Sequence, residues 1–296
     1  MKKLKNPLQE IYELSNRPMA DKEELPFPRM IDIELTNRCN YKCVMCPTGQ
    51  GTVKRPLGDM DFDLFLQIIE EASRFGAPIR FIRWGEPMLY QRLADALIEA
   101  KTLECICHIN TNGSLMDHEW EDFFVKVGLD SIKFSFQGVT KKGYQYMRNT
   151  PNFHRILHHV QSLHQTREML EAEAPFIQIG TTITHEPDIA VEQFKSMVDN
   201  YTDAVYVGTT RDLQCPSRRD QYCECPEVFD KLSINWDGTV SACCGDYDNY
   251  TIIGDAKTDS LEDIWHGGGL LRFRKMLLEY RHNENHLCAR CARSVQ

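Results

Sequence analysis

The segment TNRCNYKCVMC at residues 36–46 decides how this chain is interpreted, because it places three cysteines in a Cys-x3-Cys-x2-Cys spacing. Cys39, Cys43 and Cys46 directly follow Met30–Leu35, an apolar stretch that is typical of a β-strand. Three thiolates on one loop can bind three irons of a four-iron cubane and leave the fourth iron open to a small molecule. An iron with an open coordination position can bind a molecule that reacts there, whereas a cluster that only transfers electrons does not need one.

A structural zinc site is the alternative for these three cysteines. Structural zinc takes four ligands in a tetrahedron, and no fourth cysteine or histidine lies close to this segment. We therefore favour an iron–sulfur cluster at the end of the first strand, which is the edge where barrel-shaped α/β enzymes place their active sites.

The composition of the whole chain narrows the class of protein. A length of 296 residues is enough for one large domain plus a small one. The hydrophobic fraction of 42% is in the range of globular proteins, and the formal net charge is −9. An acidic chain repels phosphate backbones, so nucleic acid is not an expected partner. Neither a long apolar run nor a secretory signal is present, so we expect no membrane partner. Twelve cysteines without a secretory signal then indicate metal or cluster binding in a reducing cytoplasmic location.

Strand-like and helix-like stretches alternate through most of the chain. Such a succession of βα units predicts a parallel sheet with helices outside it. The strand candidates are Met30–Leu35, Ile79–Arg83, Cys105–Asn110, Ser131–Phe136, Phe176–Ile183 and Ala204–Val207. The helix candidates are Asp63–Arg74, Gln91–Lys101, His118–Val127, Phe153–Ala172 and Ile189–Asp199. The periodicity leaves open whether the sheet closes into a barrel.

A smaller second domain is expected after the sixth strand, where cysteines become frequent. Lys231–Ala242 predicts a β-hairpin that turns at Asp237-Gly238. A helix is expected from about Ser260 to Tyr280, interrupted at the glycines 267–269. The domains that we expect are a helical N-terminal segment at residues 1–28, a main domain at 29–213 and an auxiliary domain at 214–296.

The cysteine motif, its place after the first strand and the βα succession resemble the radical S-adenosylmethionine (SAM) superfamily. The resemblance implies an α/β fold with a partial (β/α)6 barrel of the TIM type, followed by a small α+β domain. It also implies that SAM binds the open iron of a 4Fe–4S cluster held by Cys39, Cys43 and Cys46. In that family the reduced cluster cleaves SAM to methionine and a 5′-deoxyadenosyl radical, which takes a hydrogen atom from the substrate. An electron donor such as flavodoxin or ferredoxin is the expected protein partner.

The stretch WGEP at residues 84–87 resembles the Gly-Gly-Glu-Pro motif of this superfamily. The resemblance implies that the backbone around Gly85 and the carboxylate of Glu86 hydrogen-bond the amino group of SAM. Trp84 replaces the first glycine of the common form, and since that position contributes mainly a backbone contact, the assignment is kept.

Three later positions also resemble SAM-binding residues. Asn112, in an Asn-Gly sequence that could also be a simple turn, is expected at the SAM ribose. Ser135 would point at the ribose or the carboxylate, although Gln137 stands where the family usually has an acid. Arg148 would pair with the SAM carboxylate, a bidentate task that suits a guanidinium; the alternative is a solvated arginine at a helix end.

A second group of cysteines lies in the C-terminal third. The proposed ligands are Cys225, Cys243, Cys288 and Cys291. Four thiolates saturate a cubane, so a cluster held by them would transfer electrons and would not bind SAM. The spacing resembles the SPASM/twitch extension of some radical SAM enzymes, and in particular twitch-bearing aminocyclitol dehydrogenases, with Gly238 in the expected register. Cys223 could replace Cys225 as a ligand, and a structural zinc ion could replace the cluster.

Several cysteines remain outside these two sets. Cys105 and Cys107 stand two apart on a strand candidate and are expected in the core as small hydrophobic residues. Cys215, Cys223 and Cys244 could donate a hydrogen atom in the active site, and Cys244 could also exchange with Cys243 as a ligand.

Three reactions fit these cofactors. The first oxidises an alcohol of a small polar substrate, a sugar or an aminocyclitol, to a carbonyl while the auxiliary cluster accepts an electron. The second is epimerisation, with Cys223 or Cys244 as the hydrogen donor, and the third modifies a ribosomal peptide. For the oxidation, Arg211 could orient the hydroxyl and His185 could act as general base. An activase that makes a glycyl radical and a two-cluster electron carrier are weaker alternatives, since they leave cysteine spacings or SAM motifs unexplained.

Overall fold

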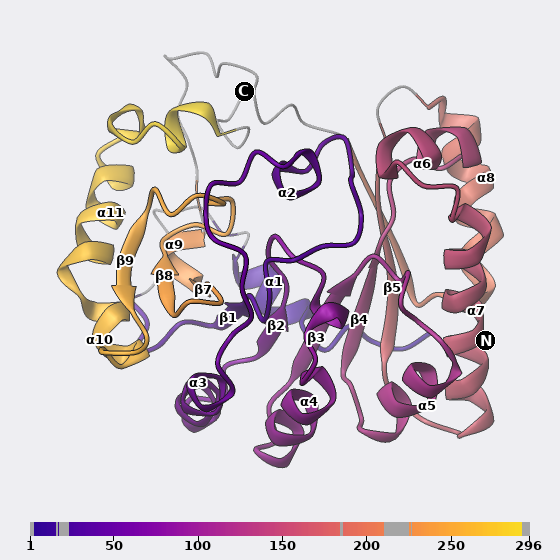
Figure 1. The fold of residues 1–296 in the computed structure, drawn as a ribbon, viewed down its shortest axis with the longest axis horizontal. Helices are drawn as coiled ribbons and strands as arrows, with labels where there is room; N and C mark the ends of the chain where they lie inside the picture. Colours follow the sequence, from indigo (N-terminus) through magenta and orange to yellow (C-terminus); the bar gives the residue numbers. More distant parts are fainter. Residues whose placement is uncertain are drawn as a thin grey trace.

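One nine-stranded sheet organises the molecule (Figure 1). The computed structural model describes residues 3–15, 17, 24–183, 186–209, 225 and 227–291. Within these residues the strand order is β6-β5-β4-β3-β2-β1-β7-β8-β9, so β6 and β9 are the two edges and the sheet stays open. The predicted α/β fold with a parallel sheet that forms only part of a barrel is confirmed.

The first six strands all form where the sequence predicts them, and each pairs in parallel with the next along the chain. They are β1 (Met30–Ile33), β2 (Ile79–Phe81), β3 (Cys107–Thr111), β4 (Ser131–Ser135), β5 (Phe176–Ile183) and β6 (Ala204–Thr209). The third begins two residues later than expected. Because all six are parallel, their carboxyl ends lie along the same edge of the sheet.

The five predicted connecting helices are also present, and Figure 1 shows them on the outer side of the strands. They are α3 (Phe62–Arg74), α4 (Leu93–Thr102), α5 (His118–Lys126), α7 (Phe153–Met169) and α8 (Asp188–Val198). Helices α1 (Gln9–Ser15), α2 (Pro47–Gln50) and α6 (Lys141–Arg148), and short 3-10 turns such as Pro87–Leu89 and Asp199–Tyr201, complete this part. No helix among the described residues has the length and apolar character needed to cross a membrane.

The two faces of the parallel strands have different chemistry. Ile31, Ile79 and Ile109 are fully buried in the hydrophobic core that the outer helices cover. Their neighbours along the strands face the opposite side, since side chains alternate, and there polar residues stand in place of aliphatic ones. Asp32 and Arg80 on this inner face form a buried ion pair, with the Arg80 Nε and the Asp32 Oδ1 2.7 Å apart.

Helix α1 covers part of this polar inner face. The Arg80 guanidinium donates a hydrogen bond to the Tyr12 hydroxyl at 3.3 Å and lies 5.8 Å from the centre of its ring. The N-terminal segment, which the sequence predicts to be helical, therefore contributes to the interior of the partial barrel.

The C-terminal strands extend the same sheet on the far side of β1. Strand β7 (Lys231–Ile234) pairs in parallel with β1, and β8 (Thr239–Ser241) and β9 (Ile252–Asp255) add antiparallel. The predicted hairpin is confirmed, and Gly238 takes a φ of 87° in its turn, which suits glycine. The predicted break in the final helix is also confirmed, between α10 (Leu261–His266) and α11 (Gly268–Leu278). The short α9 (Glu227–Asp230) precedes β7, and 3-10 turns at His282–Glu284 and Cys288–Arg290 follow α11.

A buried ion pair fixes α7 to the start of β6 and to the chain before β5. Arg167, at 1% exposure, donates to the Asp203 carboxylate and to the Pro175 carbonyl at 2.8 Å. The same carboxylate accepts the Ile177 N–H at 2.7 Å and the Leu4 N–H at 2.9 Å. Four segments therefore depend on one carboxylate whose charge is balanced by one guanidinium.

We expect Arg167→Met to lower the free energy of unfolding by about 3–5 kcal/mol, because the Asp203 charge would stay buried without its counter-charge. Anaerobic urea denaturation followed by circular dichroism measures this. The matched control is Arg74→Met, which removes the exposed Arg74–Glu70 pair on α3 and should cost less than about 0.5 kcal/mol. Equal losses in the two variants would show that the Arg167 pair does not carry this part of the fold.

Candidate functional site

The loop after β1 gathers three thiols at the carboxyl edge of the sheet. Cys39, Cys43 and Cys46 interact electrostatically with one another. Burial raises the pKa of Cys39 to about 11, assisted by the nearby Glu86 carboxylate and the other two thiols. Burial likewise raises the pKa of Cys43, which Arg148 opposes. In the absence of a cation both shifts favour the protonated thiols of Cys39 and Cys43, and a bound metal centre would supply the charge that stabilises their thiolates.

Arg148 at the end of α6 is joined to this loop. Its guanidinium donates to the Cys43 thiol at 3.3 Å and to the carbonyl oxygen of Ser135 at the end of β4. It also lies 5.4 Å from the centre of the Tyr41 ring, and the Val44 N–H donates to the Met147 carbonyl at 3.0 Å. The structure therefore brings together a proposed cysteine ligand and two proposed SAM-binding residues from separate elements.

Gly85 lies where the loop after β2 passes directly under the cysteine loop. A Cβ at this position would be 1.9 Å from the carbonyl oxygen of Thr36, so no other residue fits without moving the backbone. The next residue, Glu86, donates its N–H to the Arg38 carbonyl at 2.8 Å. The two loops are in backbone contact immediately before Cys39.

The Glu86 carboxylate links the second loop to the third. It is 3% exposed and accepts the Thr111 hydroxyl and the Asn112 N–H, each at 2.7 Å. Burial raises the pKa of Glu86, while these hydrogen bonds and the charge of Arg148 act in the opposite direction. The carboxylate is held at the carboxyl edge of the sheet by groups from β3 and the residue after it.

Asn112 makes its contacts within the loops of the described chain. Its side-chain Nδ2 donates to the side-chain Oδ1 of Asn40 at 2.9 Å and lies 4.0 Å from the Cys39 sulfur. The side-chain Oδ1 of Asn112 accepts the Ser114 N–H at 2.9 Å. Asn112 thus orients the cysteine loop, and its contact with a SAM ribose stays a prediction.

A second group of thiols lies beyond β8. Cys225, Cys243 and Cys288 interact electrostatically, and Cys291 interacts with Cys288. Burial raises the pKa of Cys288 to about 12. Cys244 is hydrogen-bonded to Cys243, and this bond together with burial raises the pKa of Cys243.

The cysteines of both groups are donors of the kind that an iron–sulfur cluster takes. In the part of the chain that the structure describes, no three of these side chains lie close enough to share one metal ion. A cubane bonds each thiolate to a different iron, so its ligands surround it and need not converge on one point.

Arg83 and Trp84 connect the segment after β2 to the loop that carries Cys243 and Cys244. The Arg83 guanidinium donates to the carbonyl oxygens of Cys243 and Asp246 at 3.3 and 3.1 Å and to the Asn235 side chain at 2.6 Å. The Trp84 indole N–H donates to the same Asp246 carbonyl at 3.2 Å. The tryptophan that replaces a motif glycine therefore packs on the loop that carries the second thiol group.

The structure describes only some of the proposed catalytic residues. His185, Arg211 and Cys223 lie outside the described residues. Cys244 lies within the second thiol group, as given above. Cys105 and Cys107 are 5% and 0% exposed, so their predicted place in the core is confirmed.

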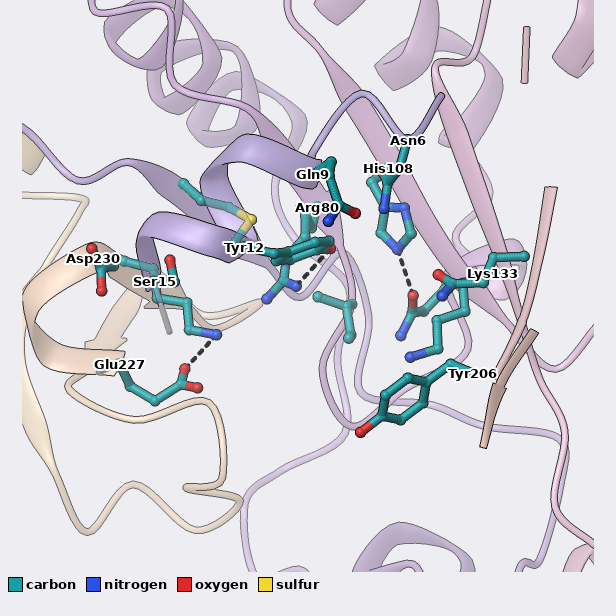
Figure 2. Close-up of a pocket in the computed structure, with 15 residues that line it drawn as sticks. Asn6, Gln9, Tyr12, Ser15, Arg80, His108, Lys133, Tyr206, Glu227 and Asp230 are labelled. Carbon is teal, nitrogen blue, oxygen red and sulfur yellow. Dashed lines mark hydrogen bonds and ion pairs between the residues drawn. The ribbon is translucent and has the colours of Figure 1, made fainter. Parts of the chain in front are cut away.

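The inner face of the sheet lines a cavity of about 460 Å³ (Figure 2). Its walls come from successive strands and from α1, and they include Tyr12, Arg80, His108, Lys133 and Tyr206. His108 hydrogen-bonds both Ser131 and Asn110, and burial, followed by the Arg80 charge, lowers its pKa to about 3. A volume of about 300–1,000 Å³ is usual for small-molecule sites.

The sequence analysis missed Arg83 and Lys133. Both are charged residues at or within a buried parallel strand, where aliphatic residues are usual. That departure is the signal that could have identified them, although it does not show which face of the sheet they occupy.

Two family models match the chain. The radical SAM superfamily model covers residues 33–168, and an iron–sulfur cluster-binding domain model of the SPASM type covers residues 223–292. The matched ranges contain the first thiol group with Glu86, Asn112 and Arg148, and the second thiol group, respectively.

Two relatives align over most of their length. A tungsten-containing aldehyde ferredoxin oxidoreductase cofactor-modifying protein from Pyrococcus furiosus is 26% identical, over 84% of this chain and 83% of the relative. An S-adenosyl-L-methionine-dependent 2-deoxy-scyllo-inosamine dehydrogenase from Niallia circulans is 25% identical, over 88% of this chain and 92% of the relative. The crystal structure of BtrN in complex with AdoMet and 2-DOIA superposes with a TM-score of 0.63 at 18% identity, over 90% of this chain and 93% of that one, which shows a shared fold.

These findings agree with the geometry of the two thiol groups. The domains imply SAM and two 4Fe–4S clusters as cofactors, and the described residues at both places suit them. The chain is a radical SAM superfamily enzyme that carries a SPASM-type iron–sulfur cluster-binding domain.

Proposed function

We propose that this enzyme oxidises an alcohol group of a small polar substrate, a sugar or an aminocyclitol, to a carbonyl. The observation that carries the proposal is the direct bonding of Arg83 and Trp84 to the Cys243–Asp246 loop. A SAM-binding segment and an electron-accepting centre that share side chains can act on one substrate. The dehydrogenase named among the relatives supports the same reaction class.

The proposed roles follow the two thiol groups. Cys39, Cys43 and Cys46 hold the SAM-binding cluster within a main domain at residues 29–213. The auxiliary cluster, in a domain at residues 214–296, has the ligands Cys225, Cys243, Cys288 and Cys291. The proposed SAM-binding residues are Gly85, Glu86, Asn112, Ser135 and Arg148. Gly85 allows the two loops to come into backbone contact, and Glu86 accepts a hydrogen bond from the SAM amino group.

The proposed oxidation removes one hydrogen atom, one proton and one electron from the substrate. A cluster held by Cys39, Cys43 and Cys46, with SAM bound and electrons from a donor such as flavodoxin or ferredoxin, would supply the radical chemistry that takes one hydrogen atom from the substrate carbon. The hydroxyl on that carbon loses its proton to a base, for which His185 is proposed, with Arg211 orienting the hydroxyl. The remaining electron leaves toward the auxiliary thiol group as the C=O bond forms. The product is lighter by two hydrogens.

Epimerisation is the less favoured reaction because it needs a thiol that is available to return a hydrogen atom. Cys244, one of the two thiols proposed for that task, is hydrogen-bonded to Cys243 within the auxiliary group. A thiol held among cluster ligands is better placed to hold the cluster than to meet a substrate radical.

The proposal predicts the mass and stoichiometry of the product. Anaerobically reconstituted and reduced protein, given SAM with a panel of sugars and aminocyclitols, should form one product two mass units lighter per 5′-deoxyadenosine. Mass spectrometry of both compounds measures this. A product of unchanged mass that gains one deuterium in heavy water would instead establish epimerisation.

Replacing single cysteines by alanine should distinguish the cysteines that bind a cluster from those that only pack in the core. We expect Cys43→Ala to lose the SAM-binding cluster, so that iron per chain falls to about half. Cys107→Ala is the control, because this thiol is equally buried but belongs to the core between β3 and the outer helices. Iron analysis and anaerobic EPR distinguish the two variants. Unchanged iron in Cys43→Ala, or equal loss in both, would contradict the assignment.

Glu86→Gln should weaken SAM binding by about tenfold or more while leaving both clusters in place. The substitution removes the negative charge opposite the SAM amino group. It also places an NH₂ group, which can only donate, against groups that now donate hydrogen bonds to the Glu86 carboxylate. Equilibrium dialysis of SAM and iron analysis give the two readouts. Glu121→Gln is the control, since Glu121 is also buried (1% exposed) and accepts the Ser162 hydroxyl, but lies on α5. Equal SAM affinity in the two variants would remove Glu86 from the site.

A further inference from the structure

The charges that line the inner cavity can be counted one by one. Glu227 on α9 is paired with Lys231 on β7, and Asp230 is paired with Arg29 at 3.2 Å. Arg80 is paired with Asp32. His108 adds no charge at neutral pH, because its pKa is about 3.

One lining charge is left over. In the described part of the chain, no ion pair or hydrogen bond engages the Lys133 ammonium; its neighbours are Arg80, which is also positive, and the Tyr206 ring, whose centre is 5.5 Å away. Burial and the Arg80 charge lower the pKa of Lys133. Figure 2 shows Lys133 and Tyr206 on one side of the cavity and the acidic Glu227 and Asp230 on the other. A negative group beside Lys133 would restore the balance.

The chain makes room for this side chain. Gly180 on β5 is the residue over which Lys133 passes, and a Cβ there would be 2.1 Å from the Lys133 Cε. Glycine weakens a strand interior, so its presence at this point has a local reason. With any larger residue at position 180, Lys133 could not lie across β5 toward β6 as it does.

Lys133 also lies close to the residues that are proposed to bind SAM. It stands two positions before Ser135 on β4, so both side chains face the same side of the sheet, about 7 Å apart along the strand. Asn110, which lines the cavity and pairs with Lys133 from the neighbouring β3, likewise stands two positions before Asn112, the residue that follows β3. The cavity therefore begins directly below the residues proposed to bind SAM.

We propose that the substrate carries an anionic group, a carboxylate or a phosphate, and that Lys133 is the residue that binds it inside the partial barrel. This rests on the proposed function, since it names the charge of the substrate for the same site. It favours acidic or phosphorylated sugars over aminocyclitols, because an ammonium group would add to an excess of positive charge that is already present.

Four probes that share one ring test the proposal. Anaerobically reconstituted full-length protein with SAM is dialysed against D-glucose, D-glucosamine, D-glucuronate and D-glucose 6-phosphate. We expect one of the two anions to bind about tenfold or more tightly than glucose, with glucosamine weakest; which anion wins identifies the source of the charge. The proposal is overturned if neither anion binds more tightly than glucose, including the case in which no probe binds.

Three variants locate the effect at Lys133. Lys133→Met should abolish the preference for the anion, whereas Lys133→Arg should retain it. Gly180→Ala leaves the charge in the protein but displaces it, so it should reduce the affinity for the anion while glucose binding is unchanged. Far-UV circular dichroism and iron content check that each variant is folded. An anion preference that survives in Lys133→Met or is unaffected in Gly180→Ala would show that Lys133 is not the binding residue.

Because binding is measured without turnover, the two proposals can fail separately. Preferential anion binding without a product two mass units lighter would leave the anion site standing and contradict the alcohol oxidation. Such a product from a neutral or cationic sugar, with no preference among the probes, would contradict only the anion site.

Discussion

The contact between Gly85 and the Thr36 carbonyl is the constraint on which the site depends. It brings the loop after β2 against the loop after β1 with no side chain between them, and the hydrogen bond from the Glu86 N–H to the Arg38 carbonyl fixes their register. From there the links continue outward, because Glu86 holds the residues after β3. A backbone contact that only glycine permits thus positions thiols, a carboxylate and an amide that lie in the loops after three different strands.

Much of this arrangement could be predicted from the sequence. The six strands, the five connecting helices and the hairpin at Gly238 follow from local periodicity and turn chemistry, which neighbouring residues determine. The cysteine spacings identified both thiol groups for the same reason. Asn112 and Trp84 could be singled out as motif residues, but their actual contacts, with Asn40 and with the Asp246 carbonyl, join segments far apart in the chain. Periodicity carries no information on such contacts.

The charged residues on the inner face of the sheet are a second case in which the sequence alone does not reveal the contacts. Asp32, Arg80 and Lys133 each interrupt an otherwise apolar strand, and a single sequence does not say whether such residues pair with one another or meet solvent or a ligand. The structure separates them, since Arg80 and Asp32 neutralise each other and Lys133 is left facing the cavity. Their different roles arise from the alternation of side chains in the sheet together with the distance between strands.

The parallel pairing of β7 with β1 has a consequence for how the two cluster-binding parts are related. Four residue pairs, from Met30–Lys231 to Ile33–Ile234, join them through the sheet itself. Main-chain hydrogen bonds set the separation of the two parts, so an electron that crosses between them travels through a fixed path and does not wait for a domain to swing on a tether. The same pairing protects the β1 edge, which would otherwise be open to association with other chains, so the auxiliary part also serves as the cover of the catalytic sheet.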